Sequence, residues 1–143
     1  SPPMPTILHD LPIRAPAARV FDAIAHPDSW WTLRSAGVPA LGARYALSFG
    51  PEYEWGAVVS ACEPGALFEW EMVEAMADWV GTRVRFELEE GDGATSVRFA
   101  HAGWGEASGH FRVSAYCWAM YLRLLRRFVE SGEVVPFDRR LDA

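Results

Sequence analysis

A single long amphipathic segment in the last third of the sequence limits the folds that this chain can adopt. From about Ser108 to Glu130, apolar residues recur at steps of three and four, the spacing of one helix face. The residues of this face are Phe111, Ala115, Trp118, Leu122, Leu125 and Val129. Gly132 is a natural stop for such a helix. A lone helix with an apolar face must pack on another element, so the rest of the chain has to supply a matching surface.

The matching surface is predicted by segments in which apolar and polar residues alternate. The expected strands are residues 6–13, 45–49, 55–62, 66–73, 80–89 and 95–101. Turn motifs at 63–65 and 91–93 separate neighbouring segments, which is typical of an antiparallel meander. Short helices are expected after Pro16 and at 27–31. We therefore predict an α+β helix-grip fold: a curved antiparallel sheet of about six strands, two short helices, and one long C-terminal helix packed across the sheet.

Composition indicates one folded domain. The 143 residues are 50% apolar and 13% aromatic, which excludes disorder as the main state. No stretch approaches the ~20 apolar residues that a membrane span needs, and no segment has the pattern of a signal peptide. We expect a domain over residues 4–137, a cloning remnant at 1–3, a tail at 138–143, and a cytoplasmic location.

Charge and cysteine content narrow the function classes further. The net charge is −6, and all 13 basic residues are arginines, so lysine chemistry is excluded. An acidic chain without a long basic run is a poor candidate for binding nucleic acid or an anionic membrane. Cys62 and Cys117 lack CxxC spacing, which favours two reduced, inert thiols over a disulfide or a metal pair.

The sequence contains no recognisable catalytic or metal-binding motif. The four histidines are scattered, without HExxH or HxxxH spacing, and no GxSxG motif is present. The glycines at 91–93 are explained by a hairpin turn rather than a phosphate loop. We therefore expect no catalytic residue, no metal and no cofactor.

Carboxylates are densest between residues 52 and 74, where paired acids could perform acid–base catalysis. Glu69 and Glu71, however, alternate with Phe68, Trp70 and Met72 along one expected strand. Strand parity therefore predicts that Glu69 and Glu71 face solvent on the outer side of the sheet.

The inner side of the sheet is the expected site. His101 shares strand parity with Val97 and Phe99, so its side chain should face the long helix. It is either a polar anchor or acid–base group for a ligand, or a buried neutral histidine satisfied by its neighbours. The expected cavity residues are Phe49, Phe68, Trp70, Phe86, Phe99, His101, Trp118 and Leu122. Trp30, Trp31 and Trp104 lie on connections that could form a cavity rim.

Several motifs together resemble a known family. They are Ile13-Arg14-Ala15-Pro16, Val20-Phe21, Trp30-Trp31-Thr32, Trp79-Val80-Gly81-Thr82, Phe99-Ala100-His101-Ala102-Gly103-Trp104, and Trp118 followed by Tyr121-Leu122, Leu125, Glu130 and Gly132. The chain resembles the SRPBCC superfamily over nearly all of residues 4–137. Within it, the sequence is similar to the bacterial branch named for homology to the activator of heat-shock protein 90 ATPase. The resemblance implies the helix-grip fold, in a superfamily of carriers, cyclases, hydroxylases and regulators.

Three functions follow as hypotheses. The first is binding of an apolar or amphipathic small molecule between the sheet and the long helix. The second is a cyclase- or hydrolase-type enzyme that uses the same cavity, with His101 and a tyrosine such as Tyr121. The third is a chaperone-associated interaction module, which predicts a filled interior and an exposed apolar patch. A homodimer is compatible with all three.

Overall fold

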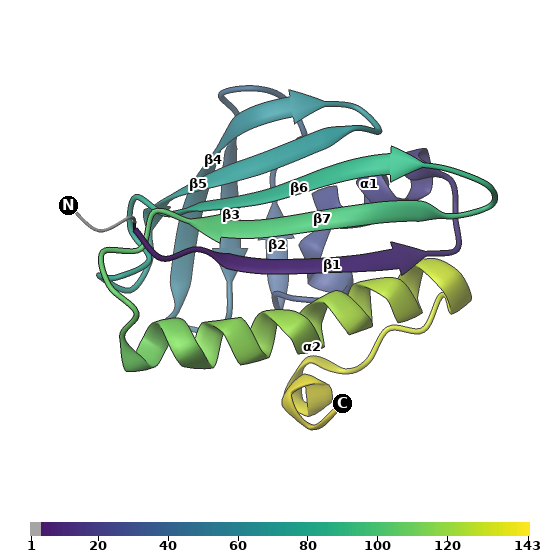
Figure 1. The fold of residues 1–143 in the computed structure, drawn as a ribbon. Coiled ribbons are helices and arrows are strands. Elements are labelled where there is room, and N and C mark those ends of the chain that lie inside the picture. Colours follow the sequence, from purple (N-terminus) through teal and green to yellow (C-terminus); the bar gives the residue numbers. More distant parts are fainter. Residues whose placement is uncertain (1–3) are drawn as a thin grey trace.

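Seven antiparallel strands and one long helix form most of the protein. The structure is a computed structural model that describes residues 4–143; the expected cloning remnant at 1–3 lies outside the described residues. The elements are β1 (Ile7–Ile13), α1 (Ala17–Ala25), η1 (Pro27–Ser29), β2 (Arg34–Ala36), β3 (Arg44–Ser48), β4 (Glu54–Glu63), β5 (Leu67–Glu74), β6 (Arg83–Glu90), β7 (Thr95–Ala102), α2 (Gly109–Ser131) and η2 (Phe137–Asp142). The sheet order is β1-β7-β6-β5-β4-β3-β2, and α2 lies across one face of the curved sheet (Figure 1). The predicted helix-grip fold is confirmed.

Two strands differ from the sequence prediction. The sheet has seven strands rather than about six, because the three residues Arg34–Ala36 form β2 at the edge beside β3. Apolar and polar residues do not alternate in this segment, so the sequence pattern did not predict a strand there. The strand expected from residue 80 begins instead at Arg83. The preceding residues form a turn, in which Val80 N–H donates to Met76 O (3.2 Å) and Gly81 adopts a φ of 85°.

The long helix begins and ends close to the predicted residues. Its first turn is capped by Ser108, whose Oγ accepts a hydrogen bond from Phe111 N–H (3.2 Å). It ends at Gly132, which has a φ of 78° and donates its N–H to Phe128 O (2.8 Å). Over residues 4–143, the structure contains no helix with the length and apolar character that crossing a membrane requires.

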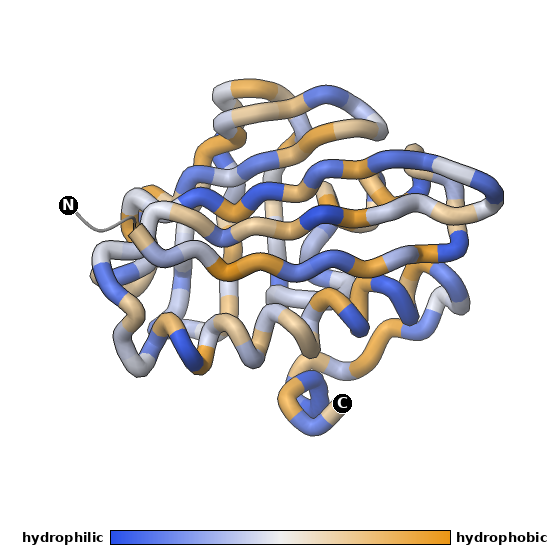
Figure 2. The backbone as a smooth tube through the Cα atoms, viewed as in Figure 1, coloured by the Kyte–Doolittle hydropathy of each residue, from blue (hydrophilic) through white to orange (hydrophobic). Residues whose placement is uncertain are grey.

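The middle of the space between sheet and helix is packed with side chains. Apolar and polar residues alternate along the central strands (Figure 2), and the apolar set faces α2. α1 and η1 also contribute to this core. The Phe21 ring lies 5.8 Å from Phe68, and Trp30 lies 6.1 Å from Phe86, centroid to centroid. Phe21 of α1 and Trp30, the residue after η1, therefore pack against the central strands.

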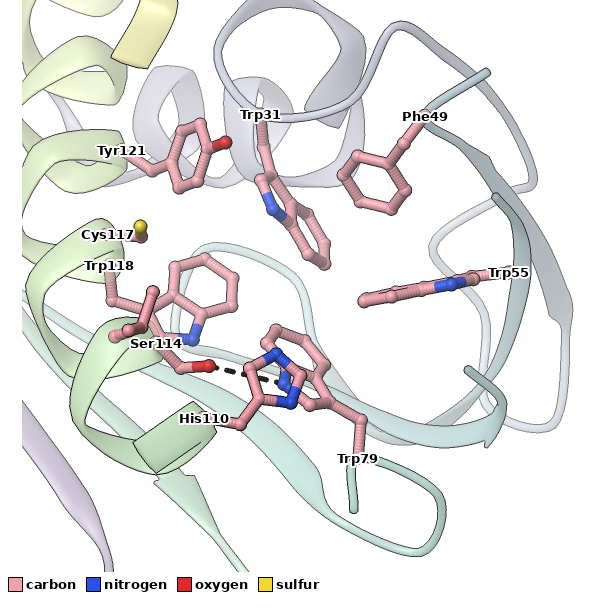
Figure 3. A pocket seen from close by; sticks show the side chains of 10 residues that line it. Trp31, Phe49, Trp55, Trp79, His110, Ser114, Cys117, Trp118 and Tyr121 are labelled. Carbon is pink, nitrogen blue, oxygen red and sulfur yellow. Dashed lines mark hydrogen bonds between the residues drawn. The ribbon is translucent and has the colours of Figure 1, made fainter. Parts of the chain in front are cut away.

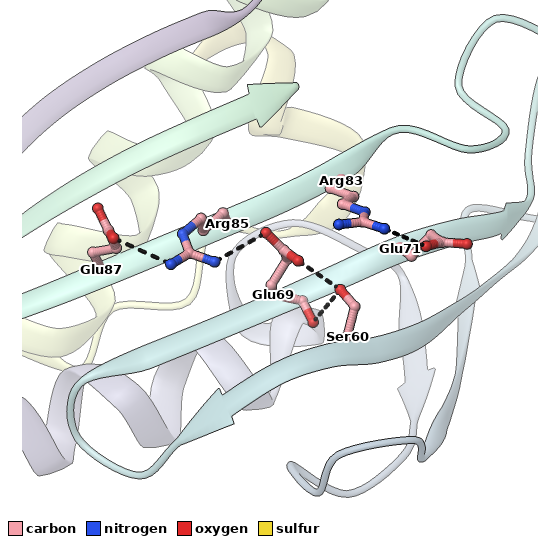
Figure 4. A network of polar contacts seen from close by, with 6 residues as sticks. All are labelled: Ser60, Glu69, Glu71, Arg83, Arg85 and Glu87. Carbon is pink, nitrogen blue, oxygen red and sulfur yellow. Dashed lines mark hydrogen bonds and ion pairs between the residues drawn. The ribbon is translucent and has the colours of Figure 1, made fainter. Parts of the chain in front are cut away.

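The outer face of the sheet carries an ion-pair network (Figure 4). Glu69 lies on this face, as strand parity predicted, but the expectation that it faces solvent is wrong because it is only 7% exposed. Arg85 approaches one of its carboxylate oxygens to 3.3 Å, and Ser60 donates a hydrogen bond to the other (2.8 Å). Glu71 is partly exposed, as expected, and pairs with Arg83 (3.3 Å). These carboxylates have structural partners and lie across the sheet from the helix.

The C-terminal segment is anchored to the domain by one arginine. Residues 138–143, expected as a tail, largely belong to η2, where Arg140 is 3% exposed. Its guanidinium donates to the main-chain oxygens of Thr32 (2.8 Å), Asp28 (2.9 Å) and Val135 (2.8 Å). The arginine therefore joins the chain end to the connection that follows η1, which carries Trp31.

Candidate ligand-binding site

A pocket opens between the first half of α2 and the sheet, at the end where β3 and β4 lie (Figure 3). Its volume is about 190 Å³, and six of its ten lining residues are Trp, Phe or Tyr. The lining residues are Trp31, Phe49, Trp55, Trp79, His110, Val113, Ser114, Cys117, Trp118 and Tyr121. The helix contributes residues at steps of three and four, so they share one face of α2. The pocket is a predominantly aromatic box with a few polar groups.

Five aromatic rings surround the space in a closed series of contacts. Trp118 lies 4.8 Å from Trp31, which lies 5.4 Å from Phe49. Phe49 contacts Trp55 at 4.9 Å, Trp55 contacts Trp79 at 5.0 Å, and Trp79 lies 6.0 Å from Trp118, all measured between ring centroids. Such pairs are each worth about 0.5–1.5 kcal/mol beyond area burial, so the walls support one another.

Two hydrogen bonds join the β5–β6 loop to the beginning of α2. Trp79 Nε1–H donates to Ser114 Oγ (3.3 Å), and His110 Nδ1 lies 2.8 Å from both carboxylate oxygens of Asp78. Asp78 and Trp79 are adjacent in this loop, and His110 and Ser114 are one helical turn apart. The loop that forms one wall is thus held in place at two points by side chains of the opposite wall.

His101 lies behind the pocket wall, in a fully satisfied hydrogen-bond chain. Trp118 Nε1–H donates to His101 Nδ1 (3.0 Å), so the ring proton of the neutral imidazole is on Nε2. Nε2 then donates to Thr82 Oγ1 (2.8 Å), whose hydroxyl donates to Trp79 O (2.6 Å). Burial, with a smaller contribution from His110, lowers the pKa of His101 to about 3. At neutral pH, His101 is therefore an uncharged residue that positions Trp118 and Trp79.

The eight residues expected to line a cavity are placed in two groups. Phe49 and Trp118 line the pocket. The other six are packed in the core at no more than 2% exposure: Phe68, Trp70, Phe86, Phe99, His101 and Leu122. Phe21 and Trp30 pack against Phe68 and Phe86, and Trp118 contacts both Phe99 and His101. Contact between these six residues and a ligand stays a prediction.

Of the three tryptophans expected at a cavity rim, only Trp31 lines the pocket, whereas Trp30 and Trp104 are buried in the core. Sequence reasoning also missed most of the helix face that lines the pocket. His110, Ser114 and Cys117 were missed, whereas Tyr121 had been named for the enzyme hypothesis alone. These four residues are spaced at three and four residues beside Trp118, and this spacing was a usable signal.

Trp55 was a second usable signal, because it shares strand parity with Ala57 and Val59. The structure keeps this parity, because β4 pairs with β3 in continuous register, with Trp55 opposite Leu47 and Ala57 opposite Tyr45.

Titratable groups around the pocket offer little to a metal or to acid–base chemistry at His101. Among residues 4–143, no three His, Cys, Asp or Glu side chains cluster as metal ligands would. Burial raises the pKa of the Cys117 thiol and of the Tyr121 hydroxyl, so both favour their neutral forms. Both cysteines are free thiols. Cys117 and Tyr121 therefore offer the pocket hydrogen-bonding groups rather than charges.

Comparisons with known proteins agree with the architecture. The family model described as "Activator of Hsp90 ATPase homolog 1-like protein" matches residues 14–130. The Aha1 dimer from Colwellia psychrerythraea is 26% identical, with 91% of this chain and 99% of that chain covered and a TM-score of 0.82. Protein MLL2253 from Mesorhizobium loti is 18% identical (90% and 99% covered, TM-score 0.76), and CalU16 from Micromonospora echinospora is 20% identical (96% and 81%, 0.72). These two show the shared fold alone.

No curated protein matches the sequence. The assignment depends instead on the family model, which spans most of the chain, and on the helix-grip fold that these solved structures share. The chain belongs to the activator of Hsp90 ATPase homolog 1-like family, within the SRPBCC superfamily.

Proposed function

We propose that this protein binds a small aromatic molecule in the pocket between β3, β4 and the first half of α2. The observation that carries the proposal is the box of five aromatic rings around a space of about 190 Å³. Ligand sites are typically concave and mostly apolar, with a few polar groups that fix orientation. Here the polar groups are those of His110, Ser114 and Tyr121.

The pocket volume limits the ligand to about one substituted ring. A cavity of about 150 Å³ lined by apolar residues holds benzene, whereas drug-sized ligands occupy about 300–1,000 Å³. Burying about 150 Å² of aromatic surface at about 25 cal/mol per Å² contributes about 4 kcal/mol. That alone corresponds to a Kd of about 1 mM. Tighter binding therefore requires a polar contact in addition to the aromatic walls.

A pocket-filling variant tests this function. We expect fluorobenzene to bind the wild-type protein at a saturable site, measured by broadening of its fluorine NMR signal. Cys117→Phe places a ring in the pocket and should abolish this binding, because Cys117 lines the space. Tyr116→Phe, on the exposed side of the same helix, is the matched control. Absence of saturable binding, or equal binding by the folded Cys117→Phe protein, would refute the proposal.

A second candidate function is protein interaction. The packed centre of the domain and the exposed apolar residues Leu8, Val113 and Tyr116 favour it. The Colwellia protein is described as a dimer, which supports a homodimer as our proposal for this chain. Light scattering at several protein concentrations tests the dimer. A monomer that binds fluorobenzene would favour the small-molecule function.

The cytoplasm is the location we propose for this activity. The two free thiols support it, since disulfides are rare in that compartment. Fractionation of cells that express the tagged protein tests the location, and recovery outside the cytoplasmic fraction would contradict it.

A further inference from the structure

We propose that His110 and Asp78 form a proton-accepting pair at the edge of the pocket, which selects aromatic ligands that carry a phenol-type hydroxyl group. This inference rests on the proposed function, because it names the ligand class of the same pocket. It goes beyond that function by assigning a chemical role to two residues outside the aromatic walls.

The geometry of the pair leaves one imidazole nitrogen available. His110 Nδ1 lies 2.8 Å from both carboxylate oxygens of Asp78, so Nδ1 carries the proton that the carboxylate accepts. Nε2 of the neutral ring is then a hydrogen-bond acceptor. Figure 3 shows the His110 ring among the lining side chains, with the nitrogen farther from the main chain turned toward the pocket interior.

The surroundings hold this ring in place. Its centroid lies 6.1 Å from Trp79 and 5.9 Å from Trp104, and its side chain is 30% exposed. A second histidine of the chain, His26, offers a contrast on the surface of α1. Its Nδ1 lies 2.7 Å from Asp22 O and 3.6 Å from the Asp22 carboxylate, and both side chains are more than half exposed. The His26–Asp22 contact is an ordinary helix-surface pair, whereas His110 is held at a pocket wall.

The charges of the lining favour a neutral ligand with a hydrogen to donate. None of the ten lining residues is an arginine, so a ligand carboxylate would find no fixed cation there. A phenol can place its ring among the indoles and donate its hydroxyl hydrogen to His110 Nε2. On full transfer, the phenol O–H bond breaks and an N–H bond forms at Nε2, while the electron pair stays on the phenolate oxygen. Asp78 then stabilises the resulting imidazolium.

A matched pair of probes tests this role. The probes are 4-nitrophenol and nitrobenzene, which share the nitroaromatic ring and differ in the hydroxyl group. We expect calorimetry to show about tenfold tighter binding of 4-nitrophenol by the wild-type protein, since a hydrogen bond is gained at His110. At about one pH unit below the pKa of free 4-nitrophenol, the bound probe should also show a larger phenolate absorption band than the free probe shows at the same pH.

Variants of the His110–Asp78 pair and of the His26–Asp22 surface pair separate the role of His110 from a general effect of substitution. His110→Phe should still bind nitrobenzene but lose the tenfold preference and the enlarged band. His110→Gln keeps a hydrogen-bonding amide and should lose the band. This variant takes the place of His110→Phe in the test if the Phe variant does not fold. Asp78→Asn should reduce the band while retaining nitrobenzene binding. His26→Phe and Asp22→Asn, at the surface pair, should behave like the wild type.

The outcomes distinguish this inference from the proposed function. Equal affinity of the wild-type protein for the two probes would overturn the hydroxyl-selecting role and leave the aromatic pocket intact. Persistence of the preference in a folded His110→Phe protein would also overturn that role. Absence of binding by either probe would refute the proposed function itself, and the paired residues would lose their assigned role with it.

Discussion

The two halves of α2 share one amphipathic pattern but meet the rest of the domain differently. In the first half, the inward side chains include Ser114 and Cys117, and here the aromatic pocket opens. In the second half, Leu122, Leu125 and Val129 are buried at 5% exposure or less in the hydrophobic core. Side-chain volume along a helix face, rather than the position of that face, therefore decides where a cavity is left.

Trp118 lies at the junction of the two halves and carries the largest expected effect. Its ring lies 4.7 Å from Phe99 and 4.8 Å from Trp31, and its indole N–H donates to His101. Trp118→Ala should cost about 3–5 kcal/mol of unfolding free energy in urea denaturation, the range for a buried large aromatic. Tyr116→Ala, at 79% exposure, is the control and should cost about 0.5 kcal/mol or less. A loss below about 1 kcal/mol for Trp118→Ala would contradict this role.

Substitutions at Leu125, in the packed second half of α2, and at Ser114, in the first half where the pocket opens, test this difference. Leu125→Ala should cost about 2–5 kcal/mol in the same measurement, since Leu125 is fully buried and its truncation leaves a void. Ser114→Ala removes one acceptor from Trp79 Nε1 at the pocket wall, where water can replace it, so we expect a loss of about 1 kcal/mol or less. Equal losses for the two variants would remove the distinction between the halves.

The fold could be predicted from the sequence because it depends on periodicity. The helix face, the strand alternation and the turn motifs placed α2 within a residue of its observed bounds and oriented Trp70 and His101 inward. The short edge strand Arg34–Ala36 was missed, because it depends on pairing with β3 rather than on its own pattern.

The site could be predicted only in part because it depends on volumes and on chain segments meeting in space. Phe49 and Trp118 were identified, but nothing local shows that Trp31 and Trp79 meet beside α2. The inward direction of His101 followed from parity. Its role depends on an indole donor 17 residues away in sequence, which parity does not reveal.

The pH dependence of the unfolding free energy tests the role of His101, which lies behind the pocket wall. Its pKa is lowered by burial to about 3, compared with about 6.5 in the unfolded chain. The stabilising contribution of neutral His101 is complete above pH about 6.5 and is lost as the pH falls toward 3, because the unfolded chain takes up the proton first. The loss is about 1.4 kcal/mol per pH unit within this window.

A non-titrating variant isolates this contribution. We expect the difference in unfolding free energy between wild type and His101→Gln to shift by about 2 kcal/mol between pH 7 and pH 5, to the disadvantage of the wild type. Tyr116→Phe, which leaves His101 in place, should follow the wild type. A difference that is constant with pH would mean that His101 is not held neutral.

The smallest expected effect comes from enlarging a side chain at the pocket. Cys117→Leu extends an apolar side chain into open space and replaces a residue of weaker helix propensity, so the unfolding free energy should change by less than about 1 kcal/mol, with a gain favoured. Val129→Leu adds one methylene group to the packed half and should cost about 1–3 kcal/mol, because a filled core has no room for it. If Cys117→Leu were the more damaging of the two, the first half of α2 would be as tightly packed as the second, and the distinction drawn between them would fail. If it is tolerated while fluorobenzene binding is lost, the same residue shows both that the space is open and that the ligand occupies it.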